Sequence, residues 1–306
     1  MKKIFCAVLA LAAMASCSKE YIVAENKQAI GFGEAFVDNG TRADYSQFNK
    51  PVEAFKVYGT LTGSYDNTVQ IFNGADVTKP DNYYNNETGV YSEVAWLCNQ
   101  TQYWVPNAEY QFAAIVDGVA EATTTLPEKI KFTVADGAAN KDLLYATAEA
   151  SVNNNGTPNV NLVAFSFNHL LSKVMFTVNS NIGAGYSIKV TGITVEGVAE
   201  KGIYTVEGGT WAQDGNTTTT LTFGSEGAYE TRQILPVEQT LNVTISYDIY
   251  FGTTKISAAT KSGTITKTFA KNTVYNIAAT ITMTNEIKFT VKEVIDWVVD
   301  PNNITL

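Results

Sequence analysis

Leu241-Asn-Val-Thr-Ile-Ser-Tyr-Asp-Ile249 is the segment whose pattern decides the class of fold. Apolar residues alternate with polar ones along it, which is the period of a β-strand with one buried face. Similar short segments recur along the chain, separated by Asn-Gly and Asp-Gly pairs that are typical of turns. They are 56–58, 109–116, 129–134, 174–178, 188–195, 274–277 and 287–291. The pattern predicts an all-β protein made of β-sandwiches, with one helical turn over 142–149.

Composition and length suggest two domains behind a short leader. The chain has 306 residues, of which 45% are hydrophobic, and this fraction is ample for a core. A net charge of −9 argues against a nucleic-acid partner. The polar segment 151–159 is the best candidate for a linker. The expected division is a signal peptide (1–16), a propeptide with a removable strand (17–42), an N-terminal β-sandwich domain (43–152) and a C-terminal one (160–306).

The first residues have the pattern of a secretory signal. Lys2 and Lys3 precede an apolar run over 4–15, which is too short to span a bilayer as a stable helix. The run ends in Met14-Ala-Ser-Cys17, which resembles a bacterial lipobox, where the cysteine is acylated and becomes the new N-terminus. We therefore expect a lipoprotein whose Cys17 carries several acyl chains, palmitate among them, which would anchor it durably. The alternative is an ordinary signal peptide with a chance cysteine.

The stretch from Gln28 to Asp44 follows the predicted tether. Ile30, Phe32 and Phe36 are evenly spaced apolar residues and predict a short strand with one buried face. Arg42 follows among small and polar residues, where a protease could reach it. A strand cut away at this point would leave an open groove in the sheet behind it. The alternative is that Arg42 is a solvated loop charge.

Residues that could carry chemistry are few. His169 is the single histidine and lies between apolar neighbours, so we expect a core position with a hydrogen-bond partner. Cys98 is the cysteine left once Cys6 is removed and Cys17 is acylated, and we expect it to be a buried apolar residue. This inventory supports neither a catalytic triad nor a zinc site. No catalytic residue, metal ligand or cofactor is expected.

Aromatic residues allow either a core or a binding surface. At their spacing on a strand-rich segment, the cluster of Trp96, Tyr103, Trp104 and Tyr110 is expected to be core. Tyr83 and Tyr84 lie in a loop-like stretch between asparagines and are the candidate adhesive surface.

Five stretches in order along the chain resemble the fimbrillin family, the lipoprotein-derived subunits of type V pili in anaerobic Gram-negative bacteria. They are the lipobox at Cys17; the short strand with Thr41-Arg-Ala-Asp44; Trp96…Tyr103-Trp-Val-Pro106…Tyr110-Gln-Phe-Ala-Ala114; Asp142-Leu-Leu-Tyr-Ala146 followed by Phe165-Ser-Phe-Asn-His-Leu-Leu-Ser-Lys-Val174; and Ile234-Leu-Pro236 with Val291…Asp296-Trp297.

The resemblance implies a fold, a location and a mechanism. The fold would be two tandem transthyretin-like β-sandwich domains. The lipoprotein would be exposed at the cell outer membrane, and an arginine-specific protease would cut between Arg42 and Ala43. A strand from another pilin subunit would then fill the vacated groove, giving a fimbrium that supports adhesion to a host glycan or protein.

The C-terminal segment is the candidate donor strand. Its apolar residues are Ile287, Phe289, Val291, Trp297, Ile304 and Leu306. The alternative is that 287–291 is simply the last strand of the second domain. A stalk, an accessory and a tip subunit all remain open. The competing function is a non-polymerising outer-membrane anchor or a carbohydrate-binding surface lipoprotein, and nothing in the sequence indicates an enzyme.

Overall fold

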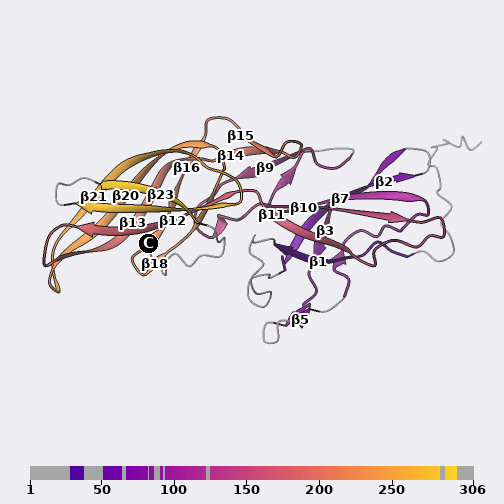
Figure 1. The fold of residues 1–306 in the computed structure, drawn as a ribbon, viewed down its shortest axis with the longest axis horizontal. Coiled ribbons are helices and arrows are strands. Elements are labelled where there is room, and N and C mark those ends of the chain that lie inside the picture. The colour runs from indigo at the N-terminus through magenta and orange to yellow at the C-terminus, as the bar shows by residue number, and fades with distance from the viewer. Residues whose placement is uncertain are drawn as a thin grey trace, which may run out of the picture.

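The computed structural model describes residues 28–37, 51–63, 67–81, 83–85, 90–91, 94–121, 125–282 and 287–294. Within these ranges the chain forms β-strands and one 3-10 turn, η1 (Gly137–Ala139), and no α-helix. No helix in this part of the chain is long and apolar enough to cross a membrane. The molecule is elongated, with the N-terminal strands at one end and the C-terminal strands at the other (Figure 1). The predicted all-β class is confirmed.

Seven strands form the N-terminal sheet, in the order β1-β11-β10-β7-β2-β3-β6. Their bounds are β1 (Phe32–Val37), β11 (Val163–His169), β10 (Leu144–Val152), β7 (Ala108–Val116), β2 (Ala54–Gly63), β3 (Thr68–Thr78) and β6 (Leu97–Cys98). β1 runs parallel to β11, whereas the other neighbours are antiparallel. Both faces of the sheet are buried in the middle, because Phe112 of β7 packs on one side and Ile115 on the other.

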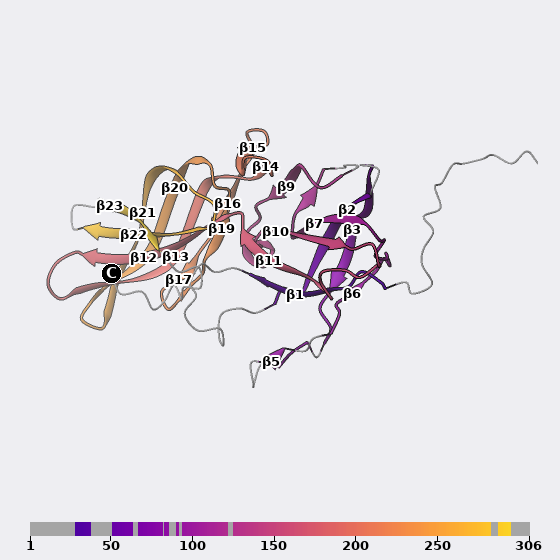
Figure 2. The same cartoon turned by 45° about the vertical axis from the view of Figure 1, so that its right-hand side comes forward.

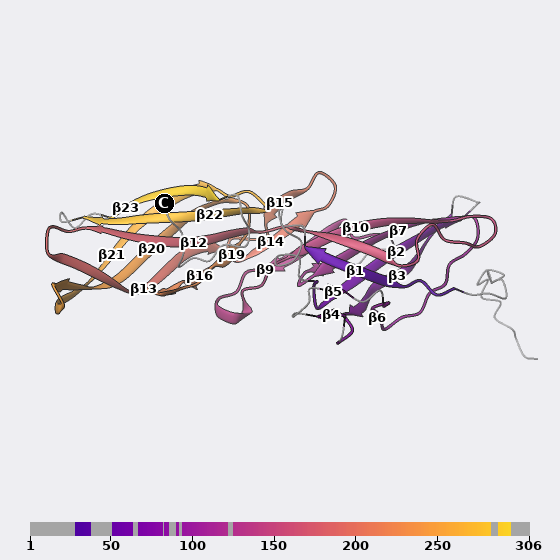
Figure 3. The same cartoon turned by 60° about the horizontal axis from the view of Figure 1, so that its bottom comes forward.

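Two four-stranded sheets make up the C-terminal half and face each other as two layers (Figure 3). One has the order β19 (Arg232–Ile234), β12 (Ser172–Asn181), β22 (Thr273–Thr282) and β23 (Ile287–Val294). The other has the order β16 (Thr218–Thr222), β13 (Tyr186–Ala199), β20 (Glu238–Phe251) and β21 (Thr254–Thr268). The rings of Phe176 and Phe223 meet between the layers with centroids 4.7 Å apart. β20 contains the alternating segment, and its Leu241, Val243 and Ile245 are buried in this core.

A smaller sheet joins strands from the two halves. Its order is β15 (Thr210–Gln213), β14 (Lys201–Thr205), β9 (Lys129–Thr133) and β8 (Val119–Ala120). β9 and β14 pair antiparallel although they are far apart in sequence. Two short hairpins complete the fold: β4 (Tyr84–Asn85) with β5 (Val90–Tyr91), and β17 (Gly224–Ser225) with β18 (Ala228–Tyr229).

Two expectations about local structure are wrong. β10 occupies the stretch where a helical turn was expected, because every residue of β10 pairs with β7. The segment 151–159 is not a link between separate sheets, since it joins β10 to β11, two strands that pair with each other. The boundary expected between 152 and 160 therefore falls within the N-terminal sheet. The chain enters the two C-terminal sheets only after His169.

Candidate strand-exchange site

β1 lies at one end of the N-terminal sheet, beside β11 (Figure 2). The Val163 N–H donates to the Gly31 carbonyl at 2.8 Å, and the two strands continue in register to Val37 with one irregularity. Ile30 is 6% exposed and Phe32 is fully buried. The predicted short strand is therefore present and inserted in the sheet.

The second edge of β1 is also hydrogen-bonded, so β1 is not an open edge strand. The N–H groups of Trp96 and Val52 donate to the carbonyls of Phe32 and Ala35 at 2.8 and 3.0 Å. Just before β1, the Trp104 N–H donates to the Gln28 backbone carbonyl, and the Ile30 N–H donates to the Gln102 backbone carbonyl. Backbone groups on both sides thus depend on this strand for their partners.

Phe32 is the centre of an aromatic cluster under β1. Its ring centroid lies 5.4 Å from that of Phe72, and the rings of Phe55, Phe112 and Phe165 lie 6.0 to 6.3 Å away. Burying a phenylalanine contributes about 1.5–3 kcal/mol from its area alone. We call this cluster, with the backbone groups of Val52, Trp96, Trp104 and Val163, the β1 site.

A bulge interrupts β1 at Glu34. The pairing with β11 shifts between Gly33 and Ala35, and Glu34 has a φ of 44°, which is unusual for a residue with a Cβ. Its N–H donates to the Tyr83 hydroxyl at 3.0 Å. The bulge places Ala35 in the core and leaves Phe36 only half-buried. Phe36 is thus less buried than Ile30 and Phe32, although it still packs against the same core.

Tyr83 does not belong to an exposed adhesive surface, and that prediction is wrong. Its side chain is 2% exposed, and its ring packs edge-on against Trp96 with centroids 5.2 Å apart. The reason is that its hydroxyl supplies the acceptor that the bulged N–H of Glu34 needs. Tyr84 forms β4 and pairs with Tyr91. Trp96, Trp104 and Tyr110 are buried as expected, whereas Tyr103 is 41% exposed.

The candidate donor residues lie at the other end of the chain. Ile287, Phe289 and Val291 are half-buried in β23, which pairs antiparallel with β22. The expected last strand over 287–291 is therefore present. Trp297, Ile304 and Leu306 lie outside the described residues, as do Cys17, Arg42 and Ala43. Their roles remain predictions.

The side chains that could carry chemistry, His169 and Cys98, have structural roles. His169 is 5% exposed at the end of β11, and its Nδ1 bonds to a carboxylate oxygen of Asp142. Burial raises the pKa of the half-buried Cys98 thiol, which weakens it as a nucleophile. No group of three or more potential metal-binding side chains occurs in the described ranges.

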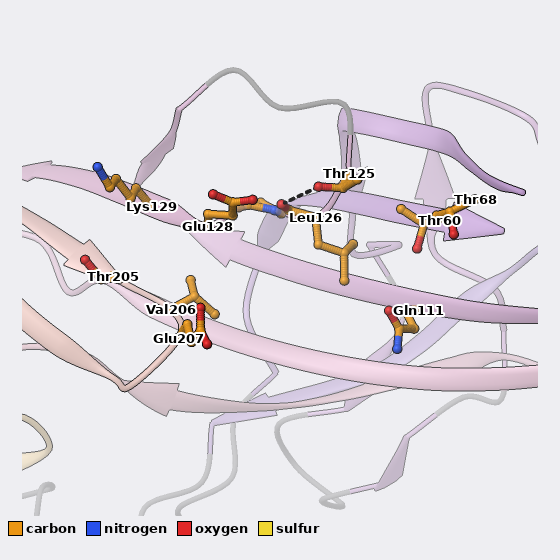
Figure 4. A pocket seen from close by; sticks show the side chains of 11 residues that line it. Thr60, Thr68, Gln111, Thr125, Leu126, Glu128, Lys129, Thr205, Val206 and Glu207 are labelled. Atoms are coloured by element: carbon orange, nitrogen blue, oxygen red, sulfur yellow. Dashed lines mark hydrogen bonds between the residues drawn. The ribbon is translucent and has the colours of Figure 1, made fainter. Parts of the chain in front are cut away.

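A pocket of about 430 Å³ opens where the small sheet meets the N-terminal sheet (Figure 4). Thr60, Gln111, Thr125 and Leu126 are among the residues that line it. The Thr125 carbonyl accepts a hydrogen bond from Gln70 at 2.7 Å. The remaining lining residues are Thr68, Pro127, Glu128, Lys129, Thr205, Val206 and Glu207. Among the described residues, the lining includes no aromatic ring on which a sugar could stack, so the pocket is a weaker candidate than the β1 site.

Sequence reasoning missed Leu162, which packs over Gly31 and Gly33. A signal for it existed, because glycines inside a strand pattern often mark a close approach by another part of the protein. It also missed the ion pair between Asp136 and Arg232. No local pattern indicates that contact, since the two residues come from different halves of the chain.

Comparisons with known families and solved structures find proteins that are similar to this chain. A family model described as fimbrillin-like matches residues 41–297. Two crystal structures share the fold, and each is provisionally described as a cell adhesion protein. The one from Bacteroides uniformis ATCC 8492 is 16% identical, with a TM-score of 0.52, over 90% of this chain and 100% of that chain. The one from Bacteroides ovatus ATCC 8483 is 15% identical, with a TM-score of 0.54, over 90% and 99%. No curated protein is significantly similar.

Proposed function

The chain belongs to the fimbrillin-like family, and from this membership we propose that it is a structural subunit of a cell-surface fimbria. Membership gives it a role in fimbria-related adhesion at the cell surface, in a family that is structural rather than enzymatic. In the proposal the chain is exported as a lipoprotein acylated at Cys17. An arginine-specific protease then cuts after Arg42 and frees β1, and subunits join by donor-strand exchange.

The observation that carries the proposal concerns arginine. The chain has two arginines, Arg42 and Arg232. Arg232 is 6% exposed and forms ion pairs with Asp136 and Glu230. An arginine-specific protease acting on the folded chain therefore has Arg42 as its remaining target. Cleavage there would separate the segment that contains β1 from the rest of the chain.

Loss of β1 would leave a site that favours another strand. The N–H groups of Val52, Trp96, Trp104 and Val163 would lose their acceptors, and each unsatisfied group costs about 1–3 kcal/mol when it stays buried. The rings around Phe32 would face water. An extended segment that restores these bonds and fills the aromatic cluster would bind by β-augmentation.

Two unfavourable features of the site with β1 in place would allow a replacement strand to bind more tightly than β1. Glu34 holds a strained positive φ, which costs about 1–3 kcal/mol. The buried indole N–H groups of Trp96 and Trp104 have no hydrogen-bond partner within the described ranges. A strand without the strain, or with acceptors for these groups, would be more stable in the site.

The remaining assignments follow the same proposal. The donor would be the C-terminal segment of a neighbouring subunit, corresponding to residues from Ile287 onward. We place the boundary between two domains after His169, where the chain leaves the N-terminal sheet. The subunit would stay at the outer membrane through its lipid until cleavage.

Limited proteolysis tests the proposal. Lipid-free protein is treated with an arginine-specific protease and then examined by N-terminal sequencing and on a gel without boiling. We expect a single new N-terminus at Ala43, loss of the β1 segment and slow-migrating oligomers. Arg42→Ala protein is the control and should give neither product. Oligomers formed equally by Arg42→Ala protein, or a surface form that still starts at Cys17, would contradict the proposal.

A further inference from the structure

Leu162 lies directly over two glycines of the β1 segment. A Cβ placed on Gly31 would lie 2.7 Å from Leu162 Cδ2, and one placed on Gly33 would lie 2.8 Å from Leu162 Cδ1. Non-bonded atoms essentially never lie this close to a Cβ, so the methyl groups of Leu162 would have to shift for any other residue. One side chain therefore restricts two alternate positions of whatever strand occupies the β1 site.

Leu162 is half-buried, and the atoms that would have to move are the ends of its side chain, while its backbone is held. It directly precedes Val163, whose N–H bonds to the Gly31 carbonyl and begins the pairing of β11 with β1. The same hydrogen bond that holds an incoming strand thus holds the backbone next to Leu162. Its two methyl groups face the two glycines, so side chains at both positions would together force Leu162 into another rotamer.

The glycines are required for space rather than for backbone conformation. Neither Gly31 nor Gly33 has a positive φ, whereas Glu34 does. An L-residue could therefore adopt the backbone at 31 and 33 if the room existed. The restriction belongs to the site, and it would apply equally to a strand from another molecule.

We infer that Leu162 is a specificity-determining residue, which makes the β1 site favour a strand with glycine at two alternate positions between large apolar residues. This inference rests on the proposed function. The occupant would repeat the order of the native segment, in which Ile30 and Phe32 are large and Gly31 and Gly33 are small.

The candidate donor segment of this chain does not meet that requirement. Residues 284–306 contain no glycine, alanine or serine, so no register of this segment places small residues opposite Leu162. A pilin subunit with a Gly-containing donor strand would therefore fill the β1 site more tightly than a second copy of this chain.

Strand exchange into the cleaved protein tests the inference. Three labelled peptides are used: residues 28–37, the same peptide with Gly31→Thr and Gly33→Thr, and residues 287–306. We expect the first peptide to bind, and each of the other two to bind at least about tenfold more weakly. Leu162→Ala should restore most of the binding of the Thr-containing peptide. Leu126→Ala, which truncates another half-buried leucine, should not.

The outcomes separate this inference from the proposed function. If the peptide 28–37 does not enter the cleaved protein, the proposed function fails. If all three peptides enter equally, the restriction by Leu162 is overturned while exchange stands. Melting temperatures of the uncut chain give a test without cleavage. The pair Gly31→Thr and Gly33→Thr should lower the melting temperature less in Leu162→Ala protein than in the parent, and an equal loss in both would overturn the inference.

Discussion

Arg232 and Asp136 form an ion pair, with 3.2 Å between Nε and Oδ1, that joins the turn after β9 to β19. Asp136 also accepts hydrogen bonds from the backbone N–H and the hydroxyl of Thr222 at 2.9 and 2.8 Å. Beside it, the Asn140 side chain bonds to the carbonyl and the N–H of Gln233. These contacts connect the N-terminal and C-terminal halves of the chain through polar groups.

Arg232→Ala should destabilise the protein by about 2 kcal/mol, because it leaves the partly buried Asp136 without its cation. Denaturant unfolding followed by tryptophan fluorescence measures the change. Lys141→Ala is a suitable control, since Lys141 pairs with Asp117 through a long, exposed contact of 3.6 Å and should change stability little. Equal losses of unfolding free energy in the two variants would show that the pair of Arg232 and Asp136 stabilises the junction no more than an exposed ion pair does.

Stability should fall in acid, partly through Asp136. Burial works to raise its pKa, but hydrogen bonds from Thr222, the Gly137 N–H and Arg232 together hold that pKa below its ordinary value. A depressed pKa in the folded state adds stability above the pKa of the unfolded chain, near pH 4, and this stability is lost as the pH falls further. Asp136→Asn should flatten the decline of unfolding free energy between about pH 4 and pH 2. An unchanged slope in this variant would contradict the assignment.

The class of fold was predictable because it depends on local alternation. The segment from Leu241 to Ile249 forms part of β20 with the expected face buried. The division of the chain was not predictable, because the turn residues at 151–159 look the same in a linker and in a connection between paired strands. The pairing of β9 with β14 was equally unpredictable from the sequence, since it depends on contacts between distant segments.

The candidate site was predictable in part for the same reason. Ile30 and Phe32 followed from strand periodicity, and both are buried. Tyr83 was misjudged because the bulge at Glu34 leaves an N–H that bonds to the Tyr83 hydroxyl, and the same bulge leaves Phe36 only half-buried. A bulge is set by what packs around the strand, so the order of apolar residues in the strand does not reveal it.

Phe32→Ala should weaken the hold on β1 by about 3–5 kcal/mol, because it empties the centre of the aromatic cluster. The β1 peptide should then leave the cleaved chain faster, which gel filtration of the protease-treated protein can follow. Phe36→Ala is the matched control, since its ring is only half-buried and should matter less. Equal release rates in the two variants would argue that Phe32 does not anchor β1.

Glu34→Gly should stabilise the uncut chain by about 0.5–1 kcal/mol. Glycine removes the cost of a positive φ, which exceeds the entropy that it adds to the unfolded state. Calorimetric melting measures the gain. Glu34→Ala keeps a Cβ in the same strained backbone and should show no gain. If the alanine variant were stabilised as much, the charge of Glu34 rather than its φ would be responsible.

Tyr83→Phe should loosen β1 without disturbing the packing around it. The ring still fills the space beside Trp96, but the Glu34 N–H loses its acceptor, at a cost of about 1–2 kcal/mol. Because the change is local, hydrogen exchange of the Glu34 amide should quicken about tenfold, while amides in β20 keep their rates. Tyr275→Phe is the matched control, since it removes an acceptor from the Ala270 N–H in the C-terminal half, away from β1. If Tyr83→Phe accelerated exchange throughout the molecule, the hydroxyl would support the fold as a whole and not the release of one strand.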